Sequence, residues 1–246
     1  MGKKMRLKIM TYNIQHCRNH NLCGNVIDYK NTAIPILDNA PDFVGLNEVR
    51  RGYDDPSLDQ SARLGKLTDL SAYFEKSIIV KRGSEDEYEY GNAVLTSLKV
   101  LSVTKTDIPD PDEKIYESHY EHRSVLVVRA LADHKEITFL VSHFGLNPDE
   151  LSRAVDTVIS LVDKIDTPLV LIGDFNANAE NPEVKRLEKY LTNIASELDN
   201  KENTFPSDDP VICIDQIWYK GLTPISVNAV NGVYSDHRPL TAVFDI

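Results

Sequence analysis

Short runs of Val, Ile, Leu and aromatic residues recur along the chain and predict β-strands. Several of these runs are bounded by Gly, Pro, Asp or Asn, which favour turns. The strands expected on this basis are Leu7–Ile14, Phe43–Asn47, Tyr73–Val80, Asn92–Thr96, Val100–Ile108, Val125–Leu131, Ile137–Phe144, Leu169–Ile172, Ile212–Tyr219, Ile225–Val230 and Leu240–Phe244.

Three other segments have apolar residues at helical spacing: Tyr29–Asn39, Asp149–Ile165 and about Pro182 to Leu198. The second carries a single apolar stripe, and Asn147 followed by Pro148 provides a helix cap and a first-turn proline before it. In the third, the apolar residues also fall on one face.

Strands outnumber helices, and hairpin-length spacings alternate with helix-length ones. This pattern favours an α/β protein in which sheets pack face to face with helices outside, rather than a sheet of βαβ units alone. No repeat, low-complexity tract or Gly/Ser-rich linker divides the chain, so we expect one domain over residues 1–246.

Composition limits the classes of protein. The chain has 246 residues, of which 41% are hydrophobic, and no apolar run is long enough to span a membrane. The net charge of −11 lowers the expectation of non-specific binding to duplex DNA, which depends on a basic surface. Three cysteines cannot all pair within the chain, which suits a reducing compartment.

The N-terminal Lys3, Lys4 and Arg6 are not followed by the apolar run of a signal peptide. A cytoplasmic location is therefore the default expectation, although a native leader could be missing from the sequence. We also expect a monomer without a membrane span.

Polar residues interrupt the apolar pattern where predicted strands end. The strand 169–172 continues into Gly173, Asp174, Phe175 and Asn176, where Gly173 permits an unusual turn. Strand alternation would place Asp174 and Asn176 on one side, an arrangement suited to a cation or to an attacking water beside a phosphate oxygen. A polar turn with an Asx cap explains the same four residues about equally well.

Four further positions have both a functional and a purely structural interpretation. Glu48 closes a buried strand, where a carboxylate needs a cation or hydrogen-bond donors, but surface glutamates at strand ends are common. His143 ends an apolar face and, taken alone, is better explained as a core histidine. Asp236 and His237 precede the last strand, and Asp215 interrupts an apolar run, where a histidine is a natural partner for it.

Together these positions point to one chemistry. Five strand ends supply acids, amides and imidazoles, and the sequence contains neither GxSxG nor a phosphate-binding P-loop motif. Carboxylates and neutral oxygens suit Mg²⁺ or Mn²⁺ better than zinc.

In this order the motifs resemble the endonuclease/exonuclease/phosphatase superfamily, which has the DNase I-like fold, and in particular its small bacterial members. The matching residues span nearly the whole chain: Thr11-Tyr12-Asn13-Ile14, Leu46-Asn47-Glu48-Val49, Gly91-Asn92, His122-Arg123-Ser124, Ser142-His143, Gly173-Asp174-Phe175-Asn176, Ile214-Asp215-Gln216-Ile217 and Ser235-Asp236-His237-Arg238. The resemblance implies a four-layered α/β sandwich with two face-to-face mixed β-sheets flanked by helices.

The resemblance also implies roles for these residues. Glu48 would be the main ligand of a Mg²⁺ or Mn²⁺ ion, helped by Asn13 and Asp236. Asp174 would orient or deprotonate the attacking water, and Asn176 would hold a phosphate oxygen. His143 and His237 would stabilise the developing charge, and Asp215 would hold one of the two imidazoles. Asn92 and Arg123 would contact phosphate or support the site.

Position 143 is His where the abasic-site endonuclease branch has Tyr, which favours the branch of DNase I, sphingomyelinases and inositol-phosphatase-like enzymes. Gln216 stands where the family often has His, and we expect this to matter little. The expected activity is metal-dependent hydrolysis of a phosphate ester, favouring phosphodiesters of small organic molecules or lipid headgroups.

Three alternatives remain. A DNA or RNA nuclease needs a basic rim and stacking aromatics, but the tyrosines at 88, 90, 116 and 120 lie among acidic residues, so nucleic acid is possible and not favoured. A catalytically silent binding module is disfavoured because the residue set is intact. A zinc site from His16, Cys17, His20 and Cys23 has the right ligand types but an unfamiliar spacing, and a loop near the active site explains it better.

Overall fold

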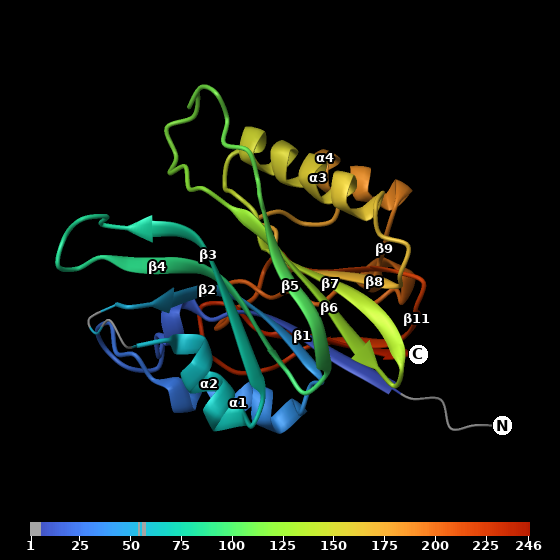
Figure 1. Ribbon diagram of the computed structural model, residues 1–246, viewed down its shortest axis with the longest axis horizontal. Helices are drawn as coiled ribbons and strands as arrows, with labels where there is room; N and C mark the ends of the chain where they lie inside the picture. The colour runs from blue at the N-terminus through green and yellow to red at the C-terminus, as the bar shows by residue number, and fades with distance from the viewer. Residues whose placement is uncertain (1–5, 54, 56–57) are drawn as a thin grey trace.

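The computed structural model describes residues 6–53, 55 and 58–246 and contains two mixed β-sheets (Figure 1). The first has the strand order β11-β12-β1-β2-β4-β3. Only β1 and β2 run parallel in it, and its other neighbours are antiparallel. Its strands are β1 (Arg6–Asn13), β2 (Phe43–Arg51), β3 (Ser71–Val80), β4 (Tyr88–Thr96), β11 (Thr223–Ala229) and β12 (Leu240–Asp245).

The second sheet has the order β5-β6-β7-β8-β10-β9, with one parallel pair, β7 and β8. Its strands are β5 (Lys99–Asp107), β6 (Ser124–Ala132), β7 (Lys135–His143), β8 (Leu169–Asp174), β9 (Thr192–Asn193) and β10 (Asp215–Lys220).

Helices cover the outer face of each sheet, which completes four layers (Figure 1). The helices α1 (Tyr29–Asn39) and α2 (Gln60–Thr68) pack on the first sheet, and α3 (Pro148–Val162) and α4 (Pro182–Lys185) pack on the second. Short 3-10 turns at Gln15–Cys17 and Arg186–Lys189 and the single-turn α5 (Ile194–Glu197) complete the elements. The predicted four-layered sandwich is therefore confirmed.

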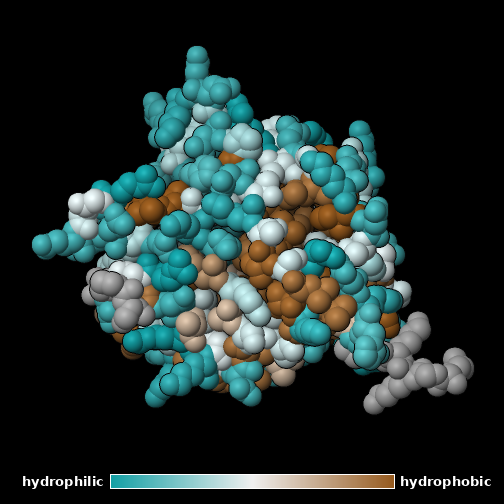
Figure 2. Space-filling model, viewed as in Figure 1, coloured by the Kyte–Doolittle hydropathy of each residue, from teal (hydrophilic) through white to brown (hydrophobic). Residues whose placement is uncertain are grey.

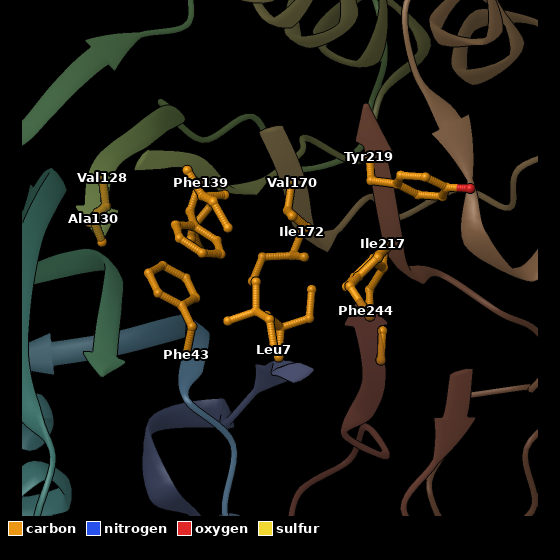
Figure 3. Close-up of a cluster of buried hydrophobic side chains, with 14 of the residues drawn as sticks. Leu7, Phe43, Val128, Ala130, Phe139, Val170, Ile172, Ile217, Tyr219 and Phe244 are labelled. Atoms are coloured by element: carbon orange, nitrogen blue, oxygen red, sulfur yellow. The ribbon is translucent and has the colours of Figure 1, made fainter. Parts of the chain in front are cut away.

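The largest hydrophobic cluster lies between the two sheets. Figure 3 shows Phe43 from the first sheet facing Phe139 from the second, and their rings stack with centroids 3.8 Å apart. Burial of such side chains stabilises the fold by about 1.5–3 kcal/mol each. This packing fixes the two sheets relative to each other, so residues at their ends are held in defined positions.

Each of the eleven predicted strands overlaps an observed strand. The helix predicted at 29–39 is α1, and α3 begins at Pro148 after the expected Asn147 cap. α2 and the two-residue β9 were not predicted. Within the described residues, no helix is long and apolar enough to cross a membrane. The basic residues Lys3 and Lys4 lie outside the described residues.

The continuous helix predicted from about Pro182 to Leu198 is wrong. Thr192 and Asn193 instead form β9 against β10, and the Asn193 side chain accepts a hydrogen bond from the Ser196 backbone N–H to cap α5. The apolar residues Val184, Leu187, Leu191 and Ile194 are buried nonetheless. The apolar residues at helical spacing lie in separate short turns here, because residues 192–193 pair with β10 as an edge strand and interrupt the helix.

Candidate active site

Strand register brings three of the predicted residues side by side. His143 ends β7, Asp174 ends β8 and Asp215 begins β10, and the pairing of these strands aligns His143 with Asp174 and Asp174 with Asp215. From the facing sheet, Asn13 ends β1 and Glu48 lies in β2. The polar strand ends seen in the sequence therefore meet at one edge of the sandwich.

Gly173 allows β8 and β7 to approach closely before Asp174. Its φ is +150°, and a Cβ atom added there would lie only 1.7 Å from the Ser142 carbonyl oxygen. Asn47 supports the next residue, because its Oδ1 accepts a hydrogen bond of 3.0 Å from the Asp174 backbone N–H. Asp174 is thereby fixed by glycine and amide neighbours that leave its carboxylate facing the site.

The Asp174 carboxylate is buried, and several polar side chains lie close to it. Its Oδ2 accepts a hydrogen bond of 3.0 Å from Asn13 and lies 3.4 Å from His143 Nε2 and 3.6 Å from His237 Nε2. Burial is the main cause that raises the pKa of Asp174 to about 6, and the Asp215 charge adds to it, while protonated His237 opposes it. A carboxylate with this pKa can hold or accept a proton near neutral pH.

Asn176 reaches the same side as Asp174, as predicted, but by a different route. The backbone turns at Asn176 with a φ of 51° instead of continuing extended, and its N–H donates to Asp174 Oδ1 at 2.9 Å. The Asn176 side chain donates to the Phe144 carbonyl at 2.9 Å and lies 3.1 Å from His143 Nε2.

His237 is held between two carboxylates. Its Nδ1 lies 2.8 Å from Asp215 Oδ2, and the Phe205 ring packs against it with centroids 4.8 Å apart. Burial alone would lower the pKa of His237, but the charges of Asp215 and Asp174 outweigh it and raise the pKa to about 10. His237 is therefore a cation at neutral pH, and Asp215 is the residue that holds the imidazole.

His143 has the opposite character. Its Nδ1 lies 3.0 Å from an amino group of Arg123, whose guanidinium also pairs with Glu121 at 2.6 Å. Burial, followed by the positive charges of Arg123 and His237, lowers the pKa of His143 well below its usual value. His143 is therefore neutral at the pH where His237 is charged.

Glu48 lies at a β-bulge where the register of β2 against β4 shifts, and its φ is 60°. Asn13 donates to Glu48 Oε1 at 3.0 Å as well as to Asp174, so one amide ties the two carboxylates together. Burial is the main cause that raises the pKa of Glu48, with further contributions from the charges of Asp236 and Asp174. Asn13 Oδ1 accepts from the Gln15 N–H at 3.1 Å.

Asp236 accepts hydrogen bonds from the Gln15 side chain and, at 3.0 Å, from Ser235 Oγ. The negative charge of Asp236 helps to raise the pKa values of both Glu48 and His237. Asp236 therefore faces the same group of acids as Glu48, Asp174 and Asp215.

The donor set fits a divalent cation. Four carboxylates gather around one protonated imidazole, His237, so the group carries excess negative charge that a cation would neutralise. Ligand atoms of Asp174, Asp215 and His237 lie within 4.8 Å of one another, and within the described ranges no other group of three such residues does so. Glu48, Asp174 and Asp236 each accept hydrogen bonds from protein groups. Asp215 faces His237 with Oδ2, and its buried Oδ1 has no hydrogen-bond partner among the residues that the structure describes.

Behind the site lies a buried amide network that joins the predicted Asn92 to Asn47, a residue to which the sequence assigned no role. Besides accepting from Asp174, Asn47 donates to Asn92 Oδ1 at 2.8 Å and to the Ser142 carbonyl at 3.1 Å. Asn92 in turn donates to the Ser124 carbonyl at 3.2 Å, so its polar atoms face inward and support the site. An asparagine inside the apolar strand 43–47 was the available signal.

The zinc interpretation of residues 16–23 is wrong. Cys17 is buried and Cys23 exposed, while His20 contacts Gln15. His16 instead faces Glu48, with Nδ1 and Oε2 3.6 Å apart, as expected for a loop beside the site. Burial and the Arg50 charge lower the pKa of His16 to about 3, so this ring is neutral.

A model of the Endonuclease/Exonuclease/phosphatase family matches residues 10–237, which include every residue of this site. The chain belongs to that family. A search of curated proteins finds no match for this member of the family.

Solved structures of other proteins share the fold of this family member. An endonuclease/exonuclease/phosphatase from Beutenbergia cavernae DSM 12333 has a TM-score of 0.78 and 21% identity, covering 99% of this chain and 72% of that one. A family protein from Leptotrichia buccalis C-1013-b has a TM-score of 0.75 and 17% identity, and the match covers 98% of this chain and 100% of that one. A truncated TDP2 from Caenorhabditis elegans has a TM-score of 0.68 and 14% identity, covering 98% of each chain.

Proposed function

We propose that this protein is a divalent-metal-dependent phosphodiesterase acting on small organic phosphodiesters or lipid headgroups. The observation that carries the proposal is the convergence of two imidazoles on one buried carboxylate: His143 Nε2 and His237 Nε2 lie 3.4 and 3.6 Å from Asp174 Oδ2. A proton acceptor flanked by two nitrogen donors suits the attack of water on a phosphoryl group.

The cation would be Mg²⁺ or Mn²⁺, held by Glu48 and Asp236 with Asn13 orienting Glu48. When bound, it would neutralise charge on the phosphoryl oxygens. The choice of ion follows from the donors, which are carboxylate and amide oxygens, the ligands that these hard cations prefer.

Protein side chains would activate the water and stabilise the negative charge on the phosphoryl group. Asp174 would orient the attacking water and take its proton as the new P–O bond forms and the ester P–O bond breaks. Cationic His237, held by Asp215, would stabilise the negative charge on the phosphoryl oxygens, and His143 and Asn176 would add neutral hydrogen bonds. Fixed donors at the place where charge develops are usually the largest single source of rate enhancement.

Small substrates are favoured over polynucleotide because of the surface near the site. The segment from Ile108 to Arg123 projects beside α3, and Figure 2 shows mainly hydrophilic side chains over this projection. Its charged residues include Asp110, Asp112, Glu113 and Glu117, with Lys114 among them. An acidic rim repels a phosphate backbone and lacks the counterion release that favours DNA binding.

Hydrolysis of bis-p-nitrophenyl phosphate with Mg²⁺ or Mn²⁺, and its loss in EDTA, tests the proposal. Turnover should vanish in Asp174→Ala and in His237→Ala. The control for the first is the exposed variant Asp112→Ala, and the control for the second is the exposed variant His119→Ala. Wild-type rates in both site variants would overturn the mechanism.

The substrate class needs separate assays. A phosphomonoester, a phospholipid and a plasmid should be offered under the same conditions. Robust plasmid cutting at physiological salt would replace the small-substrate proposal with a nuclease. Absence of hydrolysis on every substrate would favour the silent binding module.

We expect a monomer, which size-exclusion chromatography tests.

A further inference from the structure

The two ring nitrogens of His143 meet different neighbours. Nδ1 lies 3.0 Å from an amino group of Arg123, while Nε2 faces the site, 3.4 Å from Asp174 Oδ2 and 3.1 Å from the Asn176 amide nitrogen. The ring is buried, so these neighbours, and not solvent, determine which nitrogen carries a proton.

A guanidinium has only donors, so Arg123 can bond to His143 only if Nδ1 keeps its lone pair. An imidazole whose Nδ1 is bare carries its single proton on the other ring nitrogen. That proton then lies on Nε2, from which it can be donated toward the Asp174 carboxylate.

The other tautomer is less stable on these contacts. It would turn an Nδ1–H against the Arg123 cation, and Nε2 would gain only a neutral hydrogen bond from Asn176. Charge-assisted hydrogen bonds are roughly twice as strong as neutral ones. Asn176 also has another acceptor, the Phe144 carbonyl at 2.9 Å, so it does not need the imidazole.

Arg123 is held firmly enough to impose this choice. Glu121 pairs with the Arg123 guanidinium at 2.6 Å, and the Arg123 backbone carbonyl accepts a hydrogen bond from the Ile108 N–H at 2.9 Å. The preceding residues are tied to the start of α3, where the Glu121 N–H donates to Glu150 at 3.1 Å. The Arg123 side chain is only 11% exposed, and its known partners are protein groups.

We propose that Arg123 is a positioning residue that locks His143 as the Nε2–H tautomer, so that a neutral imidazole donates a hydrogen bond into the active site. Arg123 then acts through His143 and does not itself contact phosphate. The catalytic meaning of this lock rests on the proposed function, since the Nε2–H would point at the phosphoryl group. The site would contain one cationic imidazole, His237, and one neutral imidazole, His143.

Nitrogen-15 NMR of histidine-labelled, metal-free protein tests the tautomer directly. The chain has seven histidines, and His143→Gln identifies the signals of His143. Wild type and Arg123→Lys, which retains a donor-only cation, should show a protonated Nε2 and a bare Nδ1. Arg123→Met, and the charge-balanced pair Glu121→Gln with Arg123→Met, should show a mixture or the Nδ1–H form.

The matched control is Arg129→Met, which removes a β6 arginine that pairs with Glu136 at 2.6 Å, away from the site. It should leave the His143 signals unchanged. An Nδ1–H or doubly protonated His143 in the wild type would overturn the proposal, as would an unchanged pattern in both Arg123→Met variants.

Kinetics give a second readout. On bis-p-nitrophenyl phosphate, Arg123→Met should lower kcat by about tenfold or more with a smaller change in KM, since the lost donor acts mainly in the transition state. The expected NMR pattern without hydrolysis in the wild type would refute the proposed function and leave the Arg123 assignment standing. Hydrolysis by a wild type in which His143 carries its proton on Nδ1 would support the proposed function and refute the Arg123 assignment.

Discussion

His237 lies between two carboxylates, with Nδ1 2.8 Å from Asp215 Oδ2 and Nε2 3.6 Å from Asp174 Oδ2. The Asp215 contact has hydrogen-bond length and the Asp174 contact does not. Asp215 therefore orients the ring, and the Nε2–H remains available to a third group in the site. This asymmetry distinguishes Asp215, which orients the ring, from Asp174, the carboxylate proposed to react, although both are buried.

Asp215→Asn should lower kcat by about tenfold to a thousandfold, because the imidazole loses the charge that keeps it protonated. Asp215 is the largest of the charges that raise the pKa of His237 to about 10. Its removal should move the alkaline limb of the kcat/KM profile to lower pH. An unchanged profile would show that His237 is not the group that sets this limb.

The same raised pKa predicts how stability depends on pH. Protonation of His237 contributes stability that is complete below the unfolded value of about 6.5. This contribution is lost as pH rises through the folded value of about 10. Metal-free wild type should therefore lose more stability than Asp215→Asn between pH 7 and pH 10, as measured by urea unfolding. Parallel losses would contradict the prediction.

Asp174→Asn should abolish hydrolysis yet stabilise the metal-free protein at pH 7.5. The folded pKa of about 6 exceeds the ordinary value of 3.8, so the stability present below pH 4 is lost as pH rises through 6. Above that pH the buried charge costs on the order of 1–3 kcal/mol. Thermal melts in EDTA should show a higher Tm for the variant, and a lower Tm would contradict this.

Glu48→Gln should raise the Mg²⁺ concentration needed for half-maximal activity by about tenfold or more, because it removes a carboxylate from the proposed ligand set. Isothermal titration of Mg²⁺ provides a measurement independent of turnover. Glu136→Gln is a suitable control, since Glu136 pairs with Arg129 on the surface. Equal Mg²⁺ affinity in Glu48→Gln and wild type would remove Glu48 from the metal site.

Gly173→Ala should strongly destabilise the fold, because the new Cβ would lie 1.7 Å from the Ser142 carbonyl oxygen. Gly24→Ala is a control for backbone strain alone: its φ is +84° and no atom lies within 4 Å of the added Cβ. That control should cost only about 1 kcal/mol. Similar melting temperatures for the two variants would show that β8 shifts to accommodate the methyl group.

Asn47→Ala should lower stability by about 2–4 kcal/mol and also reduce kcat. It leaves the Asn92 side chain, the Ser142 carbonyl and the Asp174 N–H without their partner. Asn39→Ala, at the end of α1, removes a hydrogen bond to Pro35 far from the site and serves as the control. A stable Asn47→Ala with normal kcat would limit Asn47 to a passive place in the core.

Much of the fold was readable from the sequence because strand signals are local. The runs of branched and aromatic residues gave every strand of the two sheets except β9, which is two residues long and depends on pairing with β10. The helix expected near Pro182–Leu198 failed for the same reason, since edge pairing at Asn193 is a tertiary contact. α2 contains few apolar residues, so its pattern was weak.

The site was predictable as a set of residues and less so as a geometry. Polar breaks at strand ends identified Glu48, Asp174 and His237, and the order of motifs linked them. The left-handed turn at Asn176 and the pairing of Arg123 with His143 depend on packing between strands distant in sequence. Asn47 was overlooked because one buried amide has no distinctive pattern until its partners are known.

The most direct test of the central claim is the rate of bis-p-nitrophenyl phosphate hydrolysis by wild type and Asp174→Asn, with Mg²⁺ or Mn²⁺ and then with EDTA. Turnover is expected from the wild type only with metal, and none from a folded Asp174→Asn under any condition. Metal-independent turnover, or a variant as active as the wild type, would contradict it.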